Sequence, residues 1–203
     1  DNCLLEIIKS ERSVKFGTSD MLKGQKWVVE HTSPNPNKAM HLGHLRNNLV
    51  GMGIVRLLKW NGASVVSDAV YNDRGIAIAK LMYGFLEHMK KDSSYSTEVS
   101  CWVENMDKWY SPEEKSIKPD MFVTECYIQG EKDFKSNLNI EKRVRDLVLG
   151  WENGDENIWK LWKHVLSYAY KGVDATLSRL GNHWDKIWYE HEHYQKGKDF
   201  IVK

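Results

Sequence analysis

Two histidines and a lysine lie close together near the start of the chain. His41 and His44 are three residues apart, and Lys38 precedes them. At this spacing the two imidazoles share one face of the first turn of a helix, where backbone N–H groups and the helix dipole favour an anion. Gly43 lies between them and has no side chain, so a flat base would reach the backbone. The segment therefore predicts a site for a nucleoside triphosphate at the start of a helix.

A carboxylate precedes this segment. Glu30 ends a predicted strand, and the carboxyl edge of a parallel sheet is where ligands bind in α/β folds. A carboxylate there suits an ammonium or guanidinium group of a substrate. An ordinary charge at the end of a strand is the alternative, and the residues by themselves leave both open. Asn72 and Asp73, at the end of the next predicted strand, carry the same ambiguity.

Metal and membrane functions receive little support. Histidines three residues apart can share a zinc ion, but no third ligand follows closely, so we predict no metal site. A second cluster, His191-Glu192-His193, is interpreted as the solvated end of a strand. The three cysteines form no C-x-x-C pair, which fits a reducing cytoplasm. A net charge of +1 gives no global argument for nucleic acid, and no apolar run approaches the roughly 20 residues of a membrane span.

The elements expected to position these residues follow one another as strand, helix, strand, helix. Residues 26–31 predict a short buried strand, followed by a loop shaped by Pro34 and Pro36. A helix starts near Met40 and ends at a cap formed by Asn61 and Gly62, and close packing explains Gly51 and Gly53 inside it. Its predicted apolar face contains Leu42, Leu45, Leu49, Met52, Val55 and Leu58. A second strand over 63–70 and a helix over 76–88 complete a parallel βαβ unit.

The rest of the chain reads as a helical insertion and a return to the sheet. We expect a polar loop at 91–96, a helix start at Ser111, helices over 140–151 and 155–180, and a strand over 184–189. The predicted fold class is therefore α/β, a partial Rossmann-like doubly wound parallel sheet with a helical insertion. The expected division is a linker at 1–25 with an amphipathic segment near residues 4–8, the first half of the catalytic domain at 26–90, a mostly helical insertion at 91–180, and catalytic domain again at 181–203.

The residues of the first motif resemble a known family. His41-Leu42-Gly43-His44 is similar to the HIGH motif of class I aminoacyl-tRNA synthetases. Within that class, the arginyl-tRNA synthetase pattern V-E-x-[ST]-S-P-N-x-x-K-x-x-H-x-G-H-x-R matches from Val29 to Arg46. Residues 72–76 and 154–194 resemble later stretches of a bacterial branch, in which a serine often stands at the position of His191. The similarity covers nearly all of 26–200 and is weakest over 91–139.

The resemblance implies activation of L-arginine by ATP with magnesium, and transfer of the arginyl group from the adenylate to the 3′ end of tRNA(Arg). It implies that His41, Gly43 and His44 contact ATP, and that Lys38 lies near the phosphates and acts with the two histidines in catalysis. It further implies that Glu30 and Asn35 contact arginine. In this family, activation of the amino acid generally requires bound tRNA.

Some parts of the family pattern are missing from these 203 residues, including the K-M-S-K-S-type loop and the anticodon-binding domain. The chain opens at Asp1 and ends in the middle of an apolar pattern at 200–203. We therefore expect a fragment that does not complete the reaction by itself. Two alternatives stay open: a class I synthetase of another amino acid specificity, and a nucleotide-binding paralogue without ligase activity.

Overall fold

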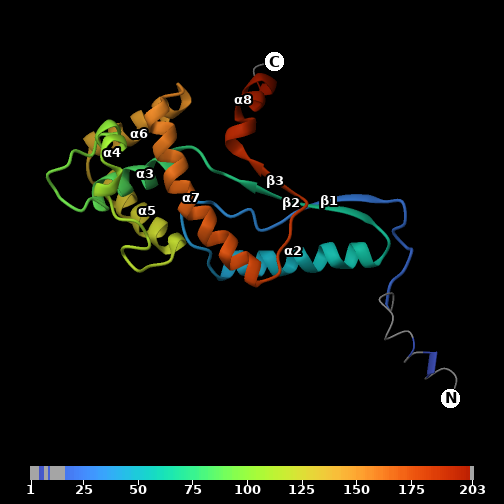
Figure 1. Ribbon diagram of the computed structural model, residues 1–203. Helices are drawn as coiled ribbons and strands as arrows, with labels where there is room; N and C mark the ends of the chain where they lie inside the picture. The colour runs from blue at the N-terminus through green and yellow to red at the C-terminus, as the bar shows by residue number, and fades with distance from the viewer. Residues whose placement is uncertain (1–4, 7–8, 10–16, 202–203) are drawn as a thin grey trace.

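Three parallel strands form the sheet in a computed structural model of the chain, which describes residues 5, 6, 9 and 17–201. The strands are β1 (Lys26–Glu30), β2 (Ser64–Tyr71) and β3 (Lys186–Tyr189), in the order β1-β2-β3 (Figure 1). The α/β class and the parallel βαβ order are confirmed, and the sheet corresponds to part of a Rossmann-like fold. Cys3 and most of the amphipathic segment expected near residues 4–8 lie outside the described residues.

Helix α2 (Leu42–Trp60) crosses from β1 to β2 and ends at the predicted cap, since Asn61 is the C-cap and Gly62 has a φ of 89°. Its predicted apolar face is partly wrong. Leu42 and Leu49 are 81% and 54% exposed, respectively. The buried side of the helix consists of Asn48, Gly51, Met52 and Val55. Met52 and Val55 are therefore buried as predicted, whereas Leu42 and Leu49 of the predicted face remain exposed.

Gly51 is the point of closest approach between α2 and the end of β1. A Cβ atom built on Gly51 would lie 2.2 Å from Cβ of His31, which is buried. Close packing therefore explains Gly51, as predicted. It does not explain Gly53, because a Cβ on Gly53 would have no neighbour within 4 Å.

This contrast gives a matched pair of substitutions in one helix. Gly51→Ala is expected to destabilise the fold by about 1–3 kcal/mol, since the new methyl group forces α2 away from His31. Gly53→Ala adds the same methyl group in open space and is expected to stabilise the helix by up to about 1 kcal/mol. Urea unfolding of both variants measures the difference. Equal effects of the two changes would show that the helix does not approach His31 as described.

Only one face of the sheet is covered within the described residues. Val65 and Tyr71 of β2 lie on the covered face, Val65 in a cluster with residues of α2 and Tyr71 in a cluster with residues of α7 (Glu156–Arg179). The opposite face is solvent-exposed, with Val28 at 70% and Val66 at 45%. The prediction of a buried first strand is therefore wrong, because β1 is covered on one side only and ends at Glu30 rather than His31.

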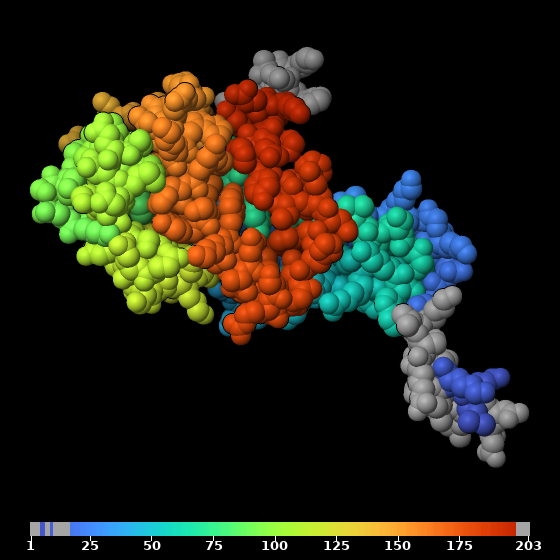
Figure 2. Space-filling model, in the orientation of Figure 1, coloured from blue at the N-terminus to red at the C-terminus, as the bar shows by residue number. Residues whose placement is uncertain are grey.

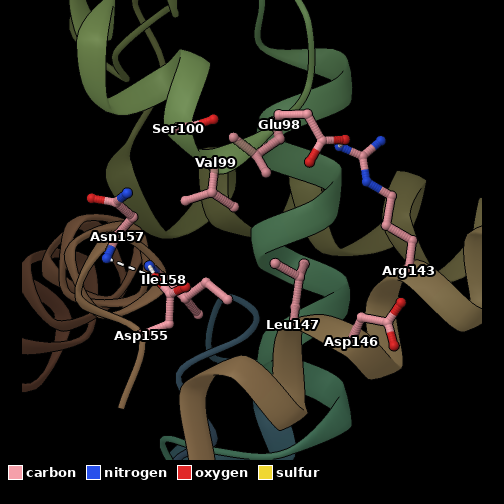
Figure 3. Close-up of a pocket in the computed structure, with 10 residues that line it drawn as sticks. Glu98, Val99, Ser100, Arg143, Asp146, Leu147, Asp155, Asn157 and Ile158 are labelled. Atoms are coloured by element: carbon pink, nitrogen blue, oxygen red, sulfur yellow. Dashed lines mark hydrogen bonds and ion pairs between the residues drawn. The ribbon is translucent and has the colours of Figure 1, made fainter. Parts of the chain in front are cut away.

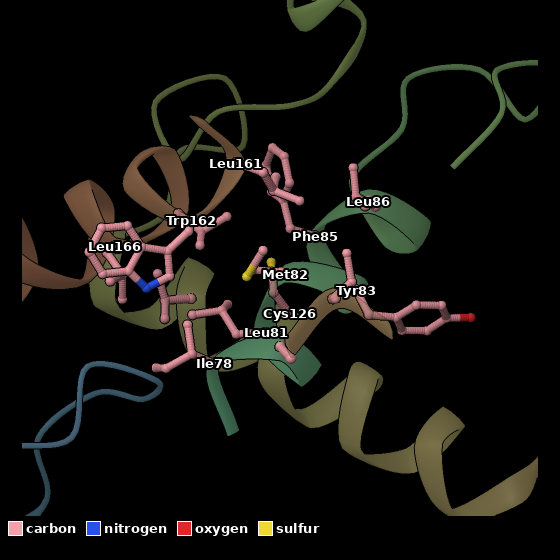
Figure 4. Packing of buried hydrophobic residues seen from close by; sticks show 14 of the residues in the cluster. Ile78, Leu81, Met82, Tyr83, Phe85, Leu86, Cys126, Leu161, Trp162 and Leu166 are labelled. Atoms are coloured by element: carbon pink, nitrogen blue, oxygen red, sulfur yellow. The ribbon is translucent and has the colours of Figure 1, made fainter. Parts of the chain in front are cut away.

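The segment between β2 and β3 forms a helical cluster with its own core (Figures 1 and 4). It contains α3 (Ile76–His88), α4 (Val99–Glu104), a short 3-10 helix (Met106–Lys108), α5 (Pro119–Ser136), α6 (Leu138–Glu152) and α7. The core gathers Phe85 and Leu86 of α3 with Cys126 of α5 and Trp162 of α7. Helix α3 thus packs with the insertion helices, while the domain boundaries given above stay a prediction. No helix in 17–201 is long and apolar enough to span a membrane.

Two local predictions are wrong. Ser111 begins a turn rather than a helix. The Ser111 hydroxyl accepts from the backbone N–H of Glu114, and the Glu114 carboxylate accepts from the backbone N–H of Ser111. The chain then turns away at Ser116, which has a φ of 54°. Helix α5 begins only at Pro119. The second error concerns His191 and His193, which lie on a helix, α8 (Glu190–Ile201), and not on a strand end.

Residues far apart in the sequence meet between the two parts of the fold. In the space-filling view, the helices of the cluster other than α7 lie towards one end of the molecule, and α2 with β1 lies at the other (Figure 2). The segment from α7 through β3 to α8 lies between them on this face. The first turn of α2, which holds the two histidines, is therefore close to the end of α7, and the two share a cavity.

Candidate active site

The two histidines of the predicted nucleotide site cap the start of α2. Nδ1 of His41 accepts from the backbone N–H of Gly43 at 3.1 Å, and Nδ1 of His44 accepts from the backbone N–H of His41 at 3.2 Å. Their rings lie 4.0 Å apart, centroid to centroid. A ring nitrogen that accepts a hydrogen bond carries no proton, so each neutral imidazole carries its proton on Nε2. The capping contacts thus leave two Nε2–H donors for a ligand.

The surroundings of His44 favour the neutral ring. Partial burial, followed by the nearby charges of His41 and Lys38, holds the pKa of His44 below its ordinary value. A Cβ atom on Gly43 would lie 2.9 Å from Cε1 of His41, so a side chain at this position would displace the His41 ring. Lys38, which is half-buried, is close enough to act electrostatically on His44. The structure therefore brings Lys38, His41, Gly43 and His44 together.

The loop before α2 has a strained backbone that specific side chains hold in place. Thr32 and Ser33 have φ angles of 72° and 34°, in a region that costs non-glycine residues about 1–3 kcal/mol each. The backbone N–H of Thr32 donates to Oδ1 of Asn47 at 2.9 Å, and its hydroxyl accepts from the buried Asn48 at 3.0 Å. The asparagines of α2 therefore fix the path of the loop between β1 and the histidines.

Glu30 is held at the carboxyl edge of the sheet. The hydroxyl of Ser33 donates to Oε1 of Glu30 at 2.7 Å and accepts from the backbone N–H of Val70 at 3.0 Å. Glu30 itself is exposed. One carboxylate oxygen is thus oriented from within the protein, and the other is available to a cationic group.

Asn35 is tied to the same edge. Its Oδ1 accepts from Nδ2 of Asn72 at 3.1 Å, and Asn72 directly follows β2. Both residues predicted to contact the amino acid are therefore anchored to the end of β2, although five positions separate them in the sequence. This leaves two groups of side chains, one at the strand ends and one at the start of α2, with the strained loop between them.

Comparison with known proteins identifies the family of this arrangement. The profile of "tRNA synthetases class I (R), catalytic domain" matches residues 7–184. The chain belongs to this family. An arginine–tRNA ligase of Treponema denticola is 33% identical over 100% of the chain, and one of Borreliella afzelii is 31% identical over 98% of it. This class I synthetase chain spans 31% of the length of each of these two relatives.

Solved structures of the family share the fold. Arginyl-tRNA synthetase of Thermus thermophilus matches 92% of the chain with a TM-score of 0.60 at 20% identity, and the match spans 26% of the Thermus chain. The enzyme of Plasmodium falciparum matches 94% of the chain with a TM-score of 0.61 at 16% identity, over 29% of its length. At these identities the likeness concerns the fold.

Sequence reasoning missed residues of the synthetase chain that support the site from a distance. Oγ1 of Thr124, on α5, accepts from the backbone N–H of Ala39 at 2.6 Å. Asn48, which holds Thr32, also donates to Oδ1 of Asn182 at 2.5 Å. These partners lie 85 and 134 residues away in the sequence, respectively, so no local pattern signals them.

A second missed cluster surrounds Asp73, the fully buried residue that follows Asn72. The backbone N–H of His191 donates to Oδ1 of Asp73 at 3.0 Å, and Nδ1 of its ring lies 2.6 Å from Oδ2. The hydroxyl of Tyr170 donates to the same Oδ2 at 3.1 Å. His191 is therefore not a solvated strand-end residue, because Asp73 caps the start of α8 and draws its ring inward. The cluster joins the end of β2 to α7 and α8.

Two cavities border the site and the insertion. The first, of about 570 Å³, lies between the start of α2 and the end of α7, and is lined by Met40, His41, Leu42, Leu45, Thr176, Arg179 and Leu180. The second, of about 430 Å³, lies among α4, α6 and α7 (Figure 3). Three polar side chains of the second cavity serve the fold, since Arg143 pairs with Glu98 and Asp155 caps α7. We assign no ligand to it.

Proposed function

We propose that the chain provides the HIGH-motif half of the catalytic domain of an arginine–tRNA ligase. In this role, His41, Gly43 and His44 bind ATP, Lys38 acts on its phosphates, and Glu30 with Asn35 binds arginine. The observation that carries the proposal is the pair of Nδ1 capping bonds, which aims two Nε2–H donors outward from one helix turn. Family membership and the relatives named arginine–tRNA ligase support it.

The chemistry follows from these positions. A carboxylate oxygen of arginine attacks the α-phosphorus of ATP, a bond to phosphorus forms, and the bond to pyrophosphate breaks. Negative charge shifts onto phosphate oxygens as this happens. Donors already aimed at those oxygens stabilise the transition state without reorganising. Glu30, oriented by Ser33, holds the guanidinium so that the other end of the amino acid faces the nucleotide.

Magnesium is a separate question. Within the described part of the chain, no three side chains of His, Cys, Asp or Glu gather in a way that would hold a metal. The residues near the histidines are cationic or imidazole donors, which do not suit Mg²⁺, an ion that prefers oxygen ligands. We therefore propose that magnesium enters on the phosphates of ATP. The arginyl group is then transferred from the adenylate to the 3′ end of tRNA(Arg), with release of AMP, in the cytoplasm.

Isotope exchange between pyrophosphate and ATP tests the proposal on the full-length protein. We expect exchange that depends on L-arginine and on tRNA, and little exchange with lysine or ornithine. Exchange stimulated by a different amino acid would support the alternative of another class I specificity. ATP binding without any exchange, with every amino acid and tRNA tested, would support the non-catalytic paralogue instead.

A further inference from the structure

Arg179 shares the 570 Å³ cavity with His41. The cavity lies within the range of about 300–1,000 Å³ that is typical of small-molecule sites. Its walls come from two elements: Met40, His41, Leu42 and Leu45 from the start of α2, and Thr176, Arg179 and Leu180 from the end of α7. None of the α7 residues belongs to the motif that carries the proposed function.

The guanidinium of Arg179 has no partner within the described residues. Arg179 is exposed at the last position of α7, and no ion pair or hydrogen bond of its side chain is found there. Other arginines of the insertion are paired: Arg145 with Glu141, and Arg143 with Glu98. A free guanidinium that shares a cavity with an imidazole donor attracts an anion, and its fork of N–H groups matches phosphate oxygens.

The apolar part of the cavity fits the rest of a nucleotide. Leu42 is 81% exposed, although it stands at the first position of α2. Together with Met40 and Leu45 it gives an apolar surface next to the cation. A ligand that combines a flat apolar group with several phosphates therefore suits this cavity better than a small inorganic anion does.

We infer that Arg179 is a further nucleotide-binding residue, which contacts the phosphates of ATP from the α7 side while His41 contacts them from α2. The inference rests on the proposed function, since it places ATP at His41. It adds that the helical insertion contributes a charge to the site. The end of α7 is thereby part of the nucleotide pocket, and not only a connection back to the sheet.

Binding constants for ATP and for adenosine, measured on the full-length protein, test this role. Arg179→Gln is expected to weaken ATP binding about tenfold or more, since a hydrogen bond to a charged group is lost. Adenosine has no phosphate, so its binding is expected to change less than twofold. Arg179→Lys keeps the charge without the fork, so its affinity for ATP is expected to lie between those of the wild type and of Arg179→Gln. Arg145→Gln, which removes an exposed charge on α6, is the matched control and should leave both constants unchanged.

Several outcomes would overturn the inference. ATP binding by Arg179→Gln that equals the wild type would remove Arg179 from the pocket and leave the proposed function intact. An equal loss for ATP and adenosine would show that the substitution disturbs the pocket itself rather than a phosphate contact. Weaker binding of a tRNA acceptor-stem duplex with unchanged ATP binding would assign the guanidinium to RNA. A wild-type protein that binds no ATP would contradict both the inference and the proposed function.

Discussion

Replacing His41 or His44 with alanine is expected to slow arginine activation by roughly 30- to 1,000-fold, which corresponds to about 2–4 kcal/mol for each lost donor. The reason is geometric. Each ring accepts a backbone hydrogen bond at Nδ1, which leaves its Nε2–H to donate to a phosphate oxygen in the proposed role. Such a donor acts mainly on the transition state, in which charge moves onto those oxygens. The rate should therefore fall more than ATP affinity does.

Pyrophosphate exchange in the presence of tRNA measures the rate, and equilibrium titration measures ATP affinity. His41 is also the N-cap of α2, and the loss of a cap costs about 0.5–2 kcal/mol of stability, so thermal unfolding of each variant must accompany the kinetics. His183→Ala is the matched control, because that side chain is 82% exposed and lies outside the motif. Unchanged exchange rates in both His41→Ala and His44→Ala would remove the two residues from the active site.

Glu30→Gln is expected to lower the affinity for arginine by about tenfold or more. The amide keeps the size of the side chain, and its oxygen continues to accept from the Ser33 hydroxyl, which donates to Oε1 in the native chain. The NH₂ group then occupies the position of the second carboxylate oxygen. A guanidinium offers only donors, so donor would face donor. Loss of a charge-assisted hydrogen bond costs roughly 1.5–3 kcal/mol.

The concentration dependence of exchange on arginine and on ATP separates the two substrates. Arginine dependence should shift in Glu30→Gln, while ATP dependence stays close to the wild type. Glu104→Gln removes the same charge from an exposed position at the end of α4 and serves as the control. If ATP dependence shifts and arginine dependence does not, Glu30 belongs to the nucleotide site and its assignment to arginine is wrong.

Local signals in the sequence predicted several elements closely. Helix α3 runs over Ile76–His88, as its pattern indicated. Helix α7 starts after Asp155, whose Oδ1 accepts from the backbone N–H groups of Asn157 and Ile158, and Gly181 follows its end with a φ of 65°. These contacts join residues within a few positions of one another. For that reason, composition and spacing were enough to predict them.

The candidate site is local in the same sense. The six residues proposed for it lie between Glu30 and His44, and two of its bonds, Ser33 to Glu30 and His41 to His44, join residues three positions apart. What anchors the site is not local. Asn72 holds Asn35 from 37 residues away, and Thr124 holds the loop from 85 residues away. A turn of a helix is specified by its own residues, but a loop between elements takes its path from whatever packs around it.

Burial was decided by the tertiary structure alone. Apolar residues such as Val28 and Leu42 are exposed, while the polar residues Asn48 and Asp73 are completely buried. The position of the His191 ring also depends on a distant residue, because the ring contacts Asp73, 118 residues earlier in the sequence. Hydrophobic pattern records the preference of each side chain, whereas burial depends on which distant element covers a given face. The sequence by itself therefore determined elements with local signals, such as α3 and α7, and the residue types of the motif, and the packing of distant elements decided which side chains are buried and which face the cavity beside His41.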